Sequence, residues 1–228
     1  MQDSNVQKNP ITLAPGVGSA YGNGWRQLWK YFLELFLIGI ISLIIGIPTG
    51  MVGWGQDAAA AVGILSFLGL FYGILINGPI DYGVSFAYLK AARGDKLEIK
   101  DMFEAFNNYW NAVLASLLVF VIVTIGLVLF IVPGIIFACK LAFTPYLVVD
   151  RKMAVIEAVK ESWRMTGGHA WKVFLILLLG IPIGIAGLIC LGVGVIISIM
   201  WITLALASLY HTVAMPKEAS DQVKVTPA

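Results

Sequence analysis

The stretch WNAVLASLLVFVIVTIGLVLFIVPGIIFACKLAFTPYLVV, residues 110–149, decides the fold. It is almost entirely apolar, and Lys140 is its only charged side chain. A helix of about 20 residues already crosses the ~30 Å hydrocarbon core of a bilayer, so this stretch is twice as long as one membrane span needs. Pro133 and Gly134 lie near its middle, and proline ends one helix and begins the next. The stretch therefore predicts a hairpin of two spans that turns at Pro133-Gly134.

Three further apolar blocks lie at 31–53, 58–80 and 171–213. The last is again of double length, and glycines between 187 and 194 allow a tight turn there. The four blocks together predict six spans arranged as three hairpins. The composition agrees, because 59% of the residues are hydrophobic and 12% are charged, whereas soluble domains carry roughly 25% charged residues. A soluble globular domain is excluded, and the predicted fold class is an all-α membrane protein.

The basic residues lie on one side of the predicted bundle. Lysine and arginine concentrate in the cytoplasmic segments of membrane proteins. All 15 of them except Lys140 fall before the first span, between the hairpins or in the tail. Both termini are therefore expected in the cytoplasm. Residues 1–24 are expected to form a flexible cytoplasmic segment, residues 25–213 the six-helix transmembrane domain, and residues 214–228 a cytoplasmic tail.

A short amphipathic stretch precedes each predicted hairpin. Its large apolar residues recur at helical spacing, which is typical of a helix that lies in the membrane interface with its apolar face inward. Asp95 followed by Glu98 predicts a cap for the second stretch. The three stretches suggest a pseudo-repeat of three hairpins, although any span that starts on the inner side would have similar residues before it. The defining residues are Trp25, Leu28, Trp29 and Phe32; Ile99, Met102, Phe103 and Phe106; and Ile156, Val159 and Trp163.

Lys140 is the one basic residue expected inside a span. A charge at that depth costs roughly 3 kcal/mol or more unless it is paired or hydrated. Glu34 and Asp81 are the acidic residues expected near the same depth. We therefore expect Lys140 to form a structural ion pair with Glu34 or Asp81. The alternatives are a substrate or ion contact in an internal cavity, or a lysine that extends toward the interface.

Helix-breaking residues interrupt two of the predicted spans. Asn77-Gly78-Pro79 lies near the cytoplasmic end of the second span, and Thr144-Pro145 lies in the fourth. Proline in a membrane helix frees a carbonyl and kinks the helix. Such breaks line transport sites in some carriers, and ordinary kinks are commoner.

The sequence contains no motif for catalysis or for a cofactor. His169 and His211 stand alone, and no metal-protease helix, nucleophile elbow, phosphate loop or dinucleotide fingerprint occurs. Cys139 and Cys190 lie in apolar runs and are expected to be buried thiols. We therefore expect no enzymatic activity, no cofactor and no metal, and nothing in the charge pattern indicates nucleic acid.

Several motifs are built around glycine and proline: Gly78-Pro79-Ile80-Asp81-Tyr82-Gly83, Arg93-Gly94-Asp95, Pro133-Gly134-Ile135, Pro145-Tyr146, Ser162-Trp163, Gly168-His169 and Leu191-Gly192-Val193-Gly194. In these the chain resembles a widespread family of uncharacterised prokaryotic six-helix membrane proteins. That family includes the YciC-like proteins and the membrane domain that precedes some glycerophosphodiester phosphodiesterases. The resemblance covers roughly residues 20–213. It implies a multi-pass protein of the bacterial inner (plasma) membrane, and it specifies a fold better than a function.

Two functions follow as hypotheses. The first is a non-enzymatic scaffold or accessory subunit that binds protein or lipid. Its partners would be anionic lipid headgroups near the clustered basic residues, and a membrane protein complex or a second copy of the chain. The alternative is a small-molecule transporter or channel that uses Lys140 and the broken helices.

Overall fold

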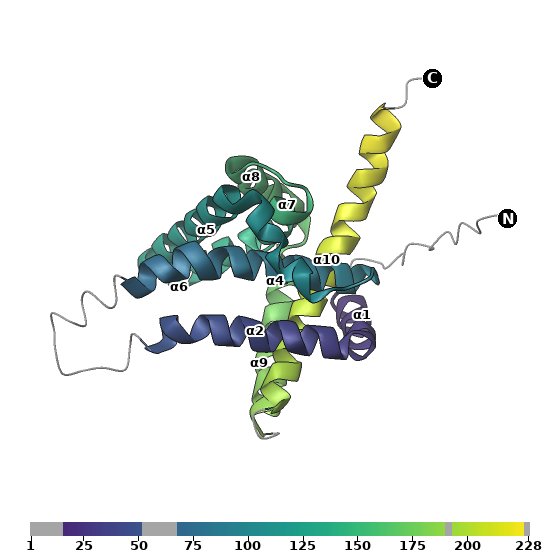
Figure 1. The fold of residues 1–228 in the computed structure, drawn as a ribbon. Coiled ribbons are helices and arrows are strands. Elements are labelled where there is room, and N and C mark those ends of the chain that lie inside the picture. Colours follow the sequence, from purple (N-terminus) through teal and green to yellow (C-terminus); the bar gives the residue numbers. More distant parts are fainter. Residues whose placement is uncertain (1–15, 52–67, 190–192, 226–228) are drawn as a thin grey trace.

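A computed structural model describes residues 16–51, 68–189 and 193–225 of the chain. Within these ranges every regular element is a helix (Figure 1), which confirms the predicted all-α class. The predicted outer turn at 53–58, the first part of the predicted second span (58–67 of 58–80), and Cys190 lie outside the described residues.

The N-terminal region consists of helix α1 (Val17–Lys30) followed by helix α2 (Phe32–Met51). The two helices meet at an angle of 92°. The prediction of a flexible segment up to residue 24 is therefore wrong from Val17 onward. The reason is a long-range contact: α1 packs along the C-terminal helix α10 (Val193–Val225), and a Cβ added to Gly24 would lie 3.2 Å from the backbone nitrogen of Ala205.

The next helical run contains one irregular turn. Residues 68–72 are α-helical, Gly73–Asn77 form the π-helical turn η1, and helix α4 extends over Gly78–Arg93. The predicted interruption at Asn77-Gly78-Pro79 thus coincides with the change from π- to α-helical geometry. Pro79 lies in the first turn of α4, and the Leu75 carbonyl, which an N–H at position 79 would bond in an α-helix, accepts from the Tyr109 hydroxyl instead. Helix α4 ends at Gly94, which adopts the left-handed conformation at φ 79° that glycine tolerates.

The stretch 110–149 folds back on itself as expected. The 3₁₀ helix η2 (Ile99–Asn108) leads into α5 (Tyr109–Leu129), and Phe130 is extended before α6 (Ile131–Leu141) begins. The turn therefore lies three residues before Pro133, within the hairpin predicted there. Gly134 packs against α5 so closely that a Cβ would lie 2.7 Å from the backbone nitrogen of Leu127. The helical run breaks at Ala142-Phe143, and the short helix α7 (Thr144–Asp150) begins with the predicted Thr144-Pro145.

The C-terminal region begins with α8 (Val155–Met165), the 3₁₀ turn η3 (Thr166–Gly168) and α9 (Ala170–Ile189). Helix α9 forms a hairpin with α10. The expected turn near Gly187–Gly194 falls on this connection, although residues 190–192 lie outside the described ranges. Helix α10 continues to Val225, so the predicted tail from residue 214 is largely helical.

Four helical segments among the described residues are long and apolar enough to cross a membrane: Ile99–Leu129, Ile131–Asp150, Ala170–Ile189 and Gly194–Met215. The bent pair α1–α2 would add a fifth. The protein is thus an all-helical chain whose apolar helices suit a membrane. Six spans and a threefold repeat stay predictions, because residues 52–67 fall in the predicted first hairpin. In Figure 1 α2 and α10 extend in different directions, so the helices do not form one parallel bundle.

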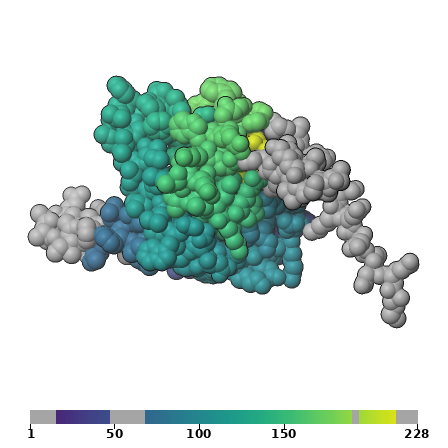
Figure 2. All heavy atoms as spheres, turned by 90° about the horizontal axis from the view of Figure 1, so that it is seen from above, coloured from purple at the N-terminus to yellow at the C-terminus, as the bar shows by residue number. Residues whose placement is uncertain are grey.

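The core lies where α1, α4, α7 and α10 meet. Its fully buried side chains include Leu28, Leu89, Tyr146 and Tyr210, and the rings of the two tyrosines stack 4.8 Å apart. By contrast, α5, α6 and α9 expose many Leu, Ile and Val side chains. In Figure 2 the green surface of α9 lies beside the teal surface of the α5–α6 hairpin. Contiguous apolar surface of this kind is the surface that lipid covers in membrane proteins.

Candidate functional site

The three predicted amphipathic stretches are all helical, as α1, η2 and α8, and each has two distinct faces. Their aromatic residues point outward: Trp25, Trp29, Phe103, Phe106 and Trp163 are between 41% and 56% exposed. Leu28 and Met102, which the sequence pattern places on the same stripe, are fully buried in the protein core. The expectation that the whole stripe faces the membrane is therefore wrong. One side of each short helix packs on the core, and the neighbouring aromatic residues are exposed on the protein surface.

The structure does not bring Lys140 together with Glu34 or Asp81. Lys140 lies in the last turn of α6, and its ammonium nitrogen lies 5.6 Å from the centroid of the Trp163 ring of α8. None of the ion pairs between described residues joins Lys140 to either carboxylate. The reason is the packing of α6, whose main neighbours are α5, α8 and α9 rather than α2 or α4. A cation–π contact of this kind contributes about 0.5–2 kcal/mol.

The break between α6 and α7 is closed by hydroxyl groups of α8 and η3. The Ser162 hydroxyl donates to the Lys140 carbonyl at 2.9 Å and accepts from the Phe143 N–H at 3.2 Å. The Thr166 hydroxyl lies 3.0 Å from the same carbonyl. Because Pro145 prevents a continuous helix here, these hydroxyls satisfy backbone groups that the break leaves without helical partners. The broken helix is thus locked against α8.

A partly buried ion pair connects α4 to α7. Arg93 donates to both carboxylate oxygens of Asp150, at 2.6 and 2.7 Å, and the Tyr210 hydroxyl of α10 lies 3.4 Å from the same carboxylate. The Asp150 side chain is 11% exposed. Sequence reasoning missed this pair. The available signal was that both residues lie outside the predicted spans on the same predicted side of the membrane.

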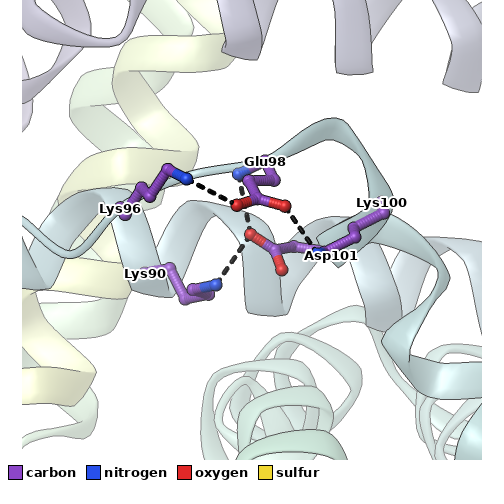
Figure 3. Close-up of polar contacts among 5 residues, drawn as sticks. All are labelled: Lys90, Lys96, Glu98, Lys100 and Asp101. Atoms are coloured by element: carbon purple, nitrogen blue, oxygen red, sulfur yellow. Dashed lines mark hydrogen bonds and ion pairs between the residues drawn. The ribbon is translucent and has the colours of Figure 1, made fainter.

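A second charged cluster surrounds the start of η2 (Figure 3). Lys90 pairs with Asp101 at 2.8 Å, and Glu98 pairs with Lys96 and Lys100 at 2.9 and 2.7 Å. Glu98 and Asp101 form the capping box, so the predicted cap at Asp95 and Glu98 is shifted by one turn. Hydrogen bonds from Lys100 and Lys96 lower the pKa of the Glu98 carboxyl to about 2.

Two cavities open on the side of α5. One, of about 450 Å³, lies between α5 and α6 and is lined mainly by apolar residues, with Tyr82, Ser116 and Thr124 as its hydroxyl groups. The other, of about 400 Å³, is lined by residues 70–81 and by α5, and includes Asn77 and Asp81. Both cavities share Ser116 and Phe120. A third cavity of about 420 Å³ lies between α6 and α9, is lined by apolar side chains, and has Cys139 in its wall.

Metal-ligating side chains do not gather anywhere in the described ranges: no group of three or more His, Cys, Asp or Glu residues is close enough to hold an ion. His169 lies in the turn before α9, where burial and the neighbouring Lys172 lower its pKa. The Arg93–Asp150 pair and the hydroxyls of Ser162 and Thr166 connect helices to one another.

Comparison with protein-family models, with curated proteins and with solved structures finds no match to this chain. The resemblance to the YciC-like proteins therefore stays a prediction.

Proposed function

We propose that this chain is a multi-pass protein of the bacterial inner membrane that acts as a non-enzymatic scaffold or accessory subunit. In this proposal six spans form three hairpins, both termini are cytoplasmic, and the cytoplasmic face binds anionic lipid and a partner membrane protein. The observation that carries the proposal is the arrangement of α1, η2 and α8. Each is fixed to the core by one face while its aromatic residues remain exposed.

Aromatic side chains in this arrangement suit the headgroup region of a bilayer. Tryptophan and other amphipathic rings concentrate there in membrane proteins, and burying a large apolar side chain contributes on the order of 1.5–3 kcal/mol. The core holds the helices in position, so ordering them against the bilayer costs little further entropy. Three such helices support a broad cytoplasmic docking face.

Basic residues lie beside these aromatic residues. Lys96 and Lys100, at the start of η2, have side chains that are 86% and 78% exposed, and Arg164 of α8 is 64% exposed. Each basic residue near an anionic membrane surface contributes about 1 kcal/mol. Glu98 reduces the attraction of Lys96 and Lys100 without removing it, because basic residues outnumber acidic ones along 90–100.

The transporter or channel alternative has weaker support. Lys140 lies against the Trp163 ring, and the backbone groups at the α6–α7 break are bonded to Ser162 and Thr166. Two of the features that suggested a transport site, Lys140 and the α6–α7 break, are therefore engaged in helix packing.

The test uses the full chain in lipid nanodiscs that contain either phosphatidylcholine alone or phosphatidylcholine with phosphatidylglycerol. Hydrogen exchange of the peptides covering η2 and α8 should be slower with the anionic lipid. Changing Phe103 and Phe106 to Asp should restore fast exchange in η2. Phe130→Asp, at an exposed aromatic residue of the α5–α6 turn, is the matched control and should leave η2 unchanged. Equal exchange in both lipids, and in the double variant, would contradict the proposal.

The scaffold role needs a second readout. The protein should retain a stoichiometric membrane partner after gentle solubilisation, and the Phe103 and Phe106 double variant should lose it while the Phe130→Asp variant keeps it. A partner that both variants retain would place the docking surface elsewhere.

A further inference from the structure

The two cavities beside α5 adjoin each other, and we call them together the α5 groove. They meet at Ser116 and Phe120. One end of the groove carries Asn77, Asp81 and the Ser116 hydroxyl. The other end is lined mainly by Val119, Val123 and Leu127 of α5 and by Ala138 and Leu141 of α6. A groove with one polar end and one long apolar end has the shape of an amphiphile.

The polar end carries a negative charge in apolar surroundings. Asp81 is exposed on the side of α4 and lines its cavity with Leu70, Ile74 and Phe120. Among the described residues, no cation or hydrogen-bond donor contacts its carboxylate; the Ser85 hydroxyl donates to its backbone carbonyl instead. A carboxylate beside hydrocarbon is costly unless a donor pairs with it. The complementary group is a cation that carries N–H donors.

The polar end lies at the level of an aromatic cluster. The Tyr109 hydroxyl donates to the Leu75 carbonyl at 3.0 Å, so the start of α5 lies alongside η1. The Tyr109 ring contacts those of Phe106 and Trp110 at 5.9 and 5.4 Å. Aromatic clusters of this kind mark the headgroup level of a bilayer. Asn77 and Asp81, close to η1, therefore lie where a lipid headgroup would be.

The apolar end matches one lipid chain in length. Ser116 and Leu127 are separated by about 16 Å along α5 at 1.5 Å per residue, which is close to one leaflet of the ~30 Å hydrocarbon core. The wall of this cavity also contains Tyr82, which is 5% exposed and whose hydroxyl has no hydrogen-bond partner among the described residues. A polar hydroxyl left unsatisfied at the wall fits an occupant that brings ester or headgroup oxygens.

We propose that the α5 groove binds one phosphatidylethanolamine molecule from the cytoplasmic leaflet. Its ammonium group pairs with Asp81, and one acyl chain lies along Val119–Leu127. Phosphatidylcholine lacks the N–H donors, and phosphatidylglycerol would place a net negative headgroup beside Asp81. The proposal rests on the membrane location in the proposed function and is independent of the scaffold role.

Native mass spectrometry of the detergent-solubilised full chain tests this site. Phosphatidylethanolamine, phosphatidylcholine and phosphatidylglycerol with identical acyl chains are added in turn. We expect one phosphatidylethanolamine to be retained about tenfold more strongly than phosphatidylcholine, as one charge-assisted hydrogen bond would give. Asp81→Asn should abolish that preference, and the control Glu157→Gln, at an exposed carboxylate of α8, should keep it. Equal retention of the lipids by the unaltered protein would overturn the proposal.

The acyl-chain end is tested separately. Val123→Phe fills the cavity and should reduce retention of all three lipids, whereas Val128→Phe, on the exposed side of the same helix, should not. A phosphatidylethanolamine with a photoreactive acyl chain should label the α5 peptide over 119–127 in the unaltered protein. Equal labelling of α5 and α9 in the unaltered protein would refute the groove. This result does not depend on whether any variant inserts into the membrane. The Phe103 and Phe106 double variant should keep this lipid. Failure of the groove proposal can therefore be distinguished from failure of the cytoplasmic docking face.

Discussion

The Arg93–Asp150 pair gives the most direct test of the core junction. Asp150→Ala removes two short charge-assisted hydrogen bonds and leaves a mostly buried guanidinium without this carboxylate. Breaking a fully buried pair costs about 3–5 kcal/mol. The two side chains are still 21% and 11% exposed, so partial hydration lowers our expected loss to about 2–3 kcal/mol.

The measurement is thermal unfolding of the purified protein in detergent. A loss of that size corresponds to a decrease in Tm of roughly 4–12 °C for a chain of this length. Glu98→Gln is the matched control, because Glu98 forms its ion pairs at the exposed surface. Exposed ion pairs contribute little to stability, so this variant should unfold close to the unaltered protein.

A double variant separates pairing from burial. Arg93→Met combined with Asp150→Leu removes both charges, and we expect its stability to lie within about 1 kcal/mol of the unaltered protein. The reasoning is refuted if the double variant loses the sum of the two single losses, or if Asp150→Ala unfolds no earlier than Glu98→Gln.

Four further outcomes are expected. Lys140→Met should leave the protein inserted and lower its stability by about 0.5–2 kcal/mol, as loss of the contact with Trp163 predicts; a larger thermal shift would indicate an additional partner. Ser162→Ala should cost about 1–3 kcal/mol, because it leaves the Phe143 N–H and the Lys140 carbonyl short of a partner, and proteolysis at the α6–α7 break should report it. The pKa of Glu98 is lowered from 4.5 to about 2, so its ionised carboxylate stabilises the start of η2 fully above pH 4.5, and this stabilisation is lost as the pH falls toward 2. Amide protection at the start of η2 should follow that profile. Protection that stays constant down to pH 2 would argue against it. A cysteine at Gly55 should be labelled from the periplasmic side and one at Lys96 should not; the reverse pattern would exclude the six-span topology.

The sequence predicted local features well because they depend on composition and spacing. The apolar length of 110–149 and its Pro133-Gly134 pair were sufficient to place the α5–α6 hairpin. The amphipathic spacing around Trp25, Phe103 and Trp163 located α1, η2 and α8. Both signals lie within a few turns of helix and need no knowledge of which helices are neighbours.

The partners of charged residues could not be predicted in the same way. Expected depth suggested Glu34 or Asp81 for Lys140, but the neighbour of α6 is α8, which brings Trp163 instead. The flexible N-terminus was wrong for the same reason, since nothing near residues 17–24 indicates that α10 covers them. Stripe residues such as Leu28 and Met102 show that an amphipathic pattern identifies an apolar face without deciding whether protein or lipid covers it.

The packing of α1 on α10 also sets the order in which the protein can assemble. The Asn23 amide donates to the Ser208 hydroxyl at 2.9 Å, and Trp201 donates to the Tyr21 carbonyl at 3.0 Å, across sequence separations of 185 and 180 residues. At about 5–20 residues per second of synthesis, α1 leaves the ribosome on the order of ten seconds or more before its partner exists. During that interval the buried amides of Asn23 and Gln27 depend on water or a chaperone. Helix α1 is therefore made well before it can be secured, and this part of the core closes only after α10 has been synthesised.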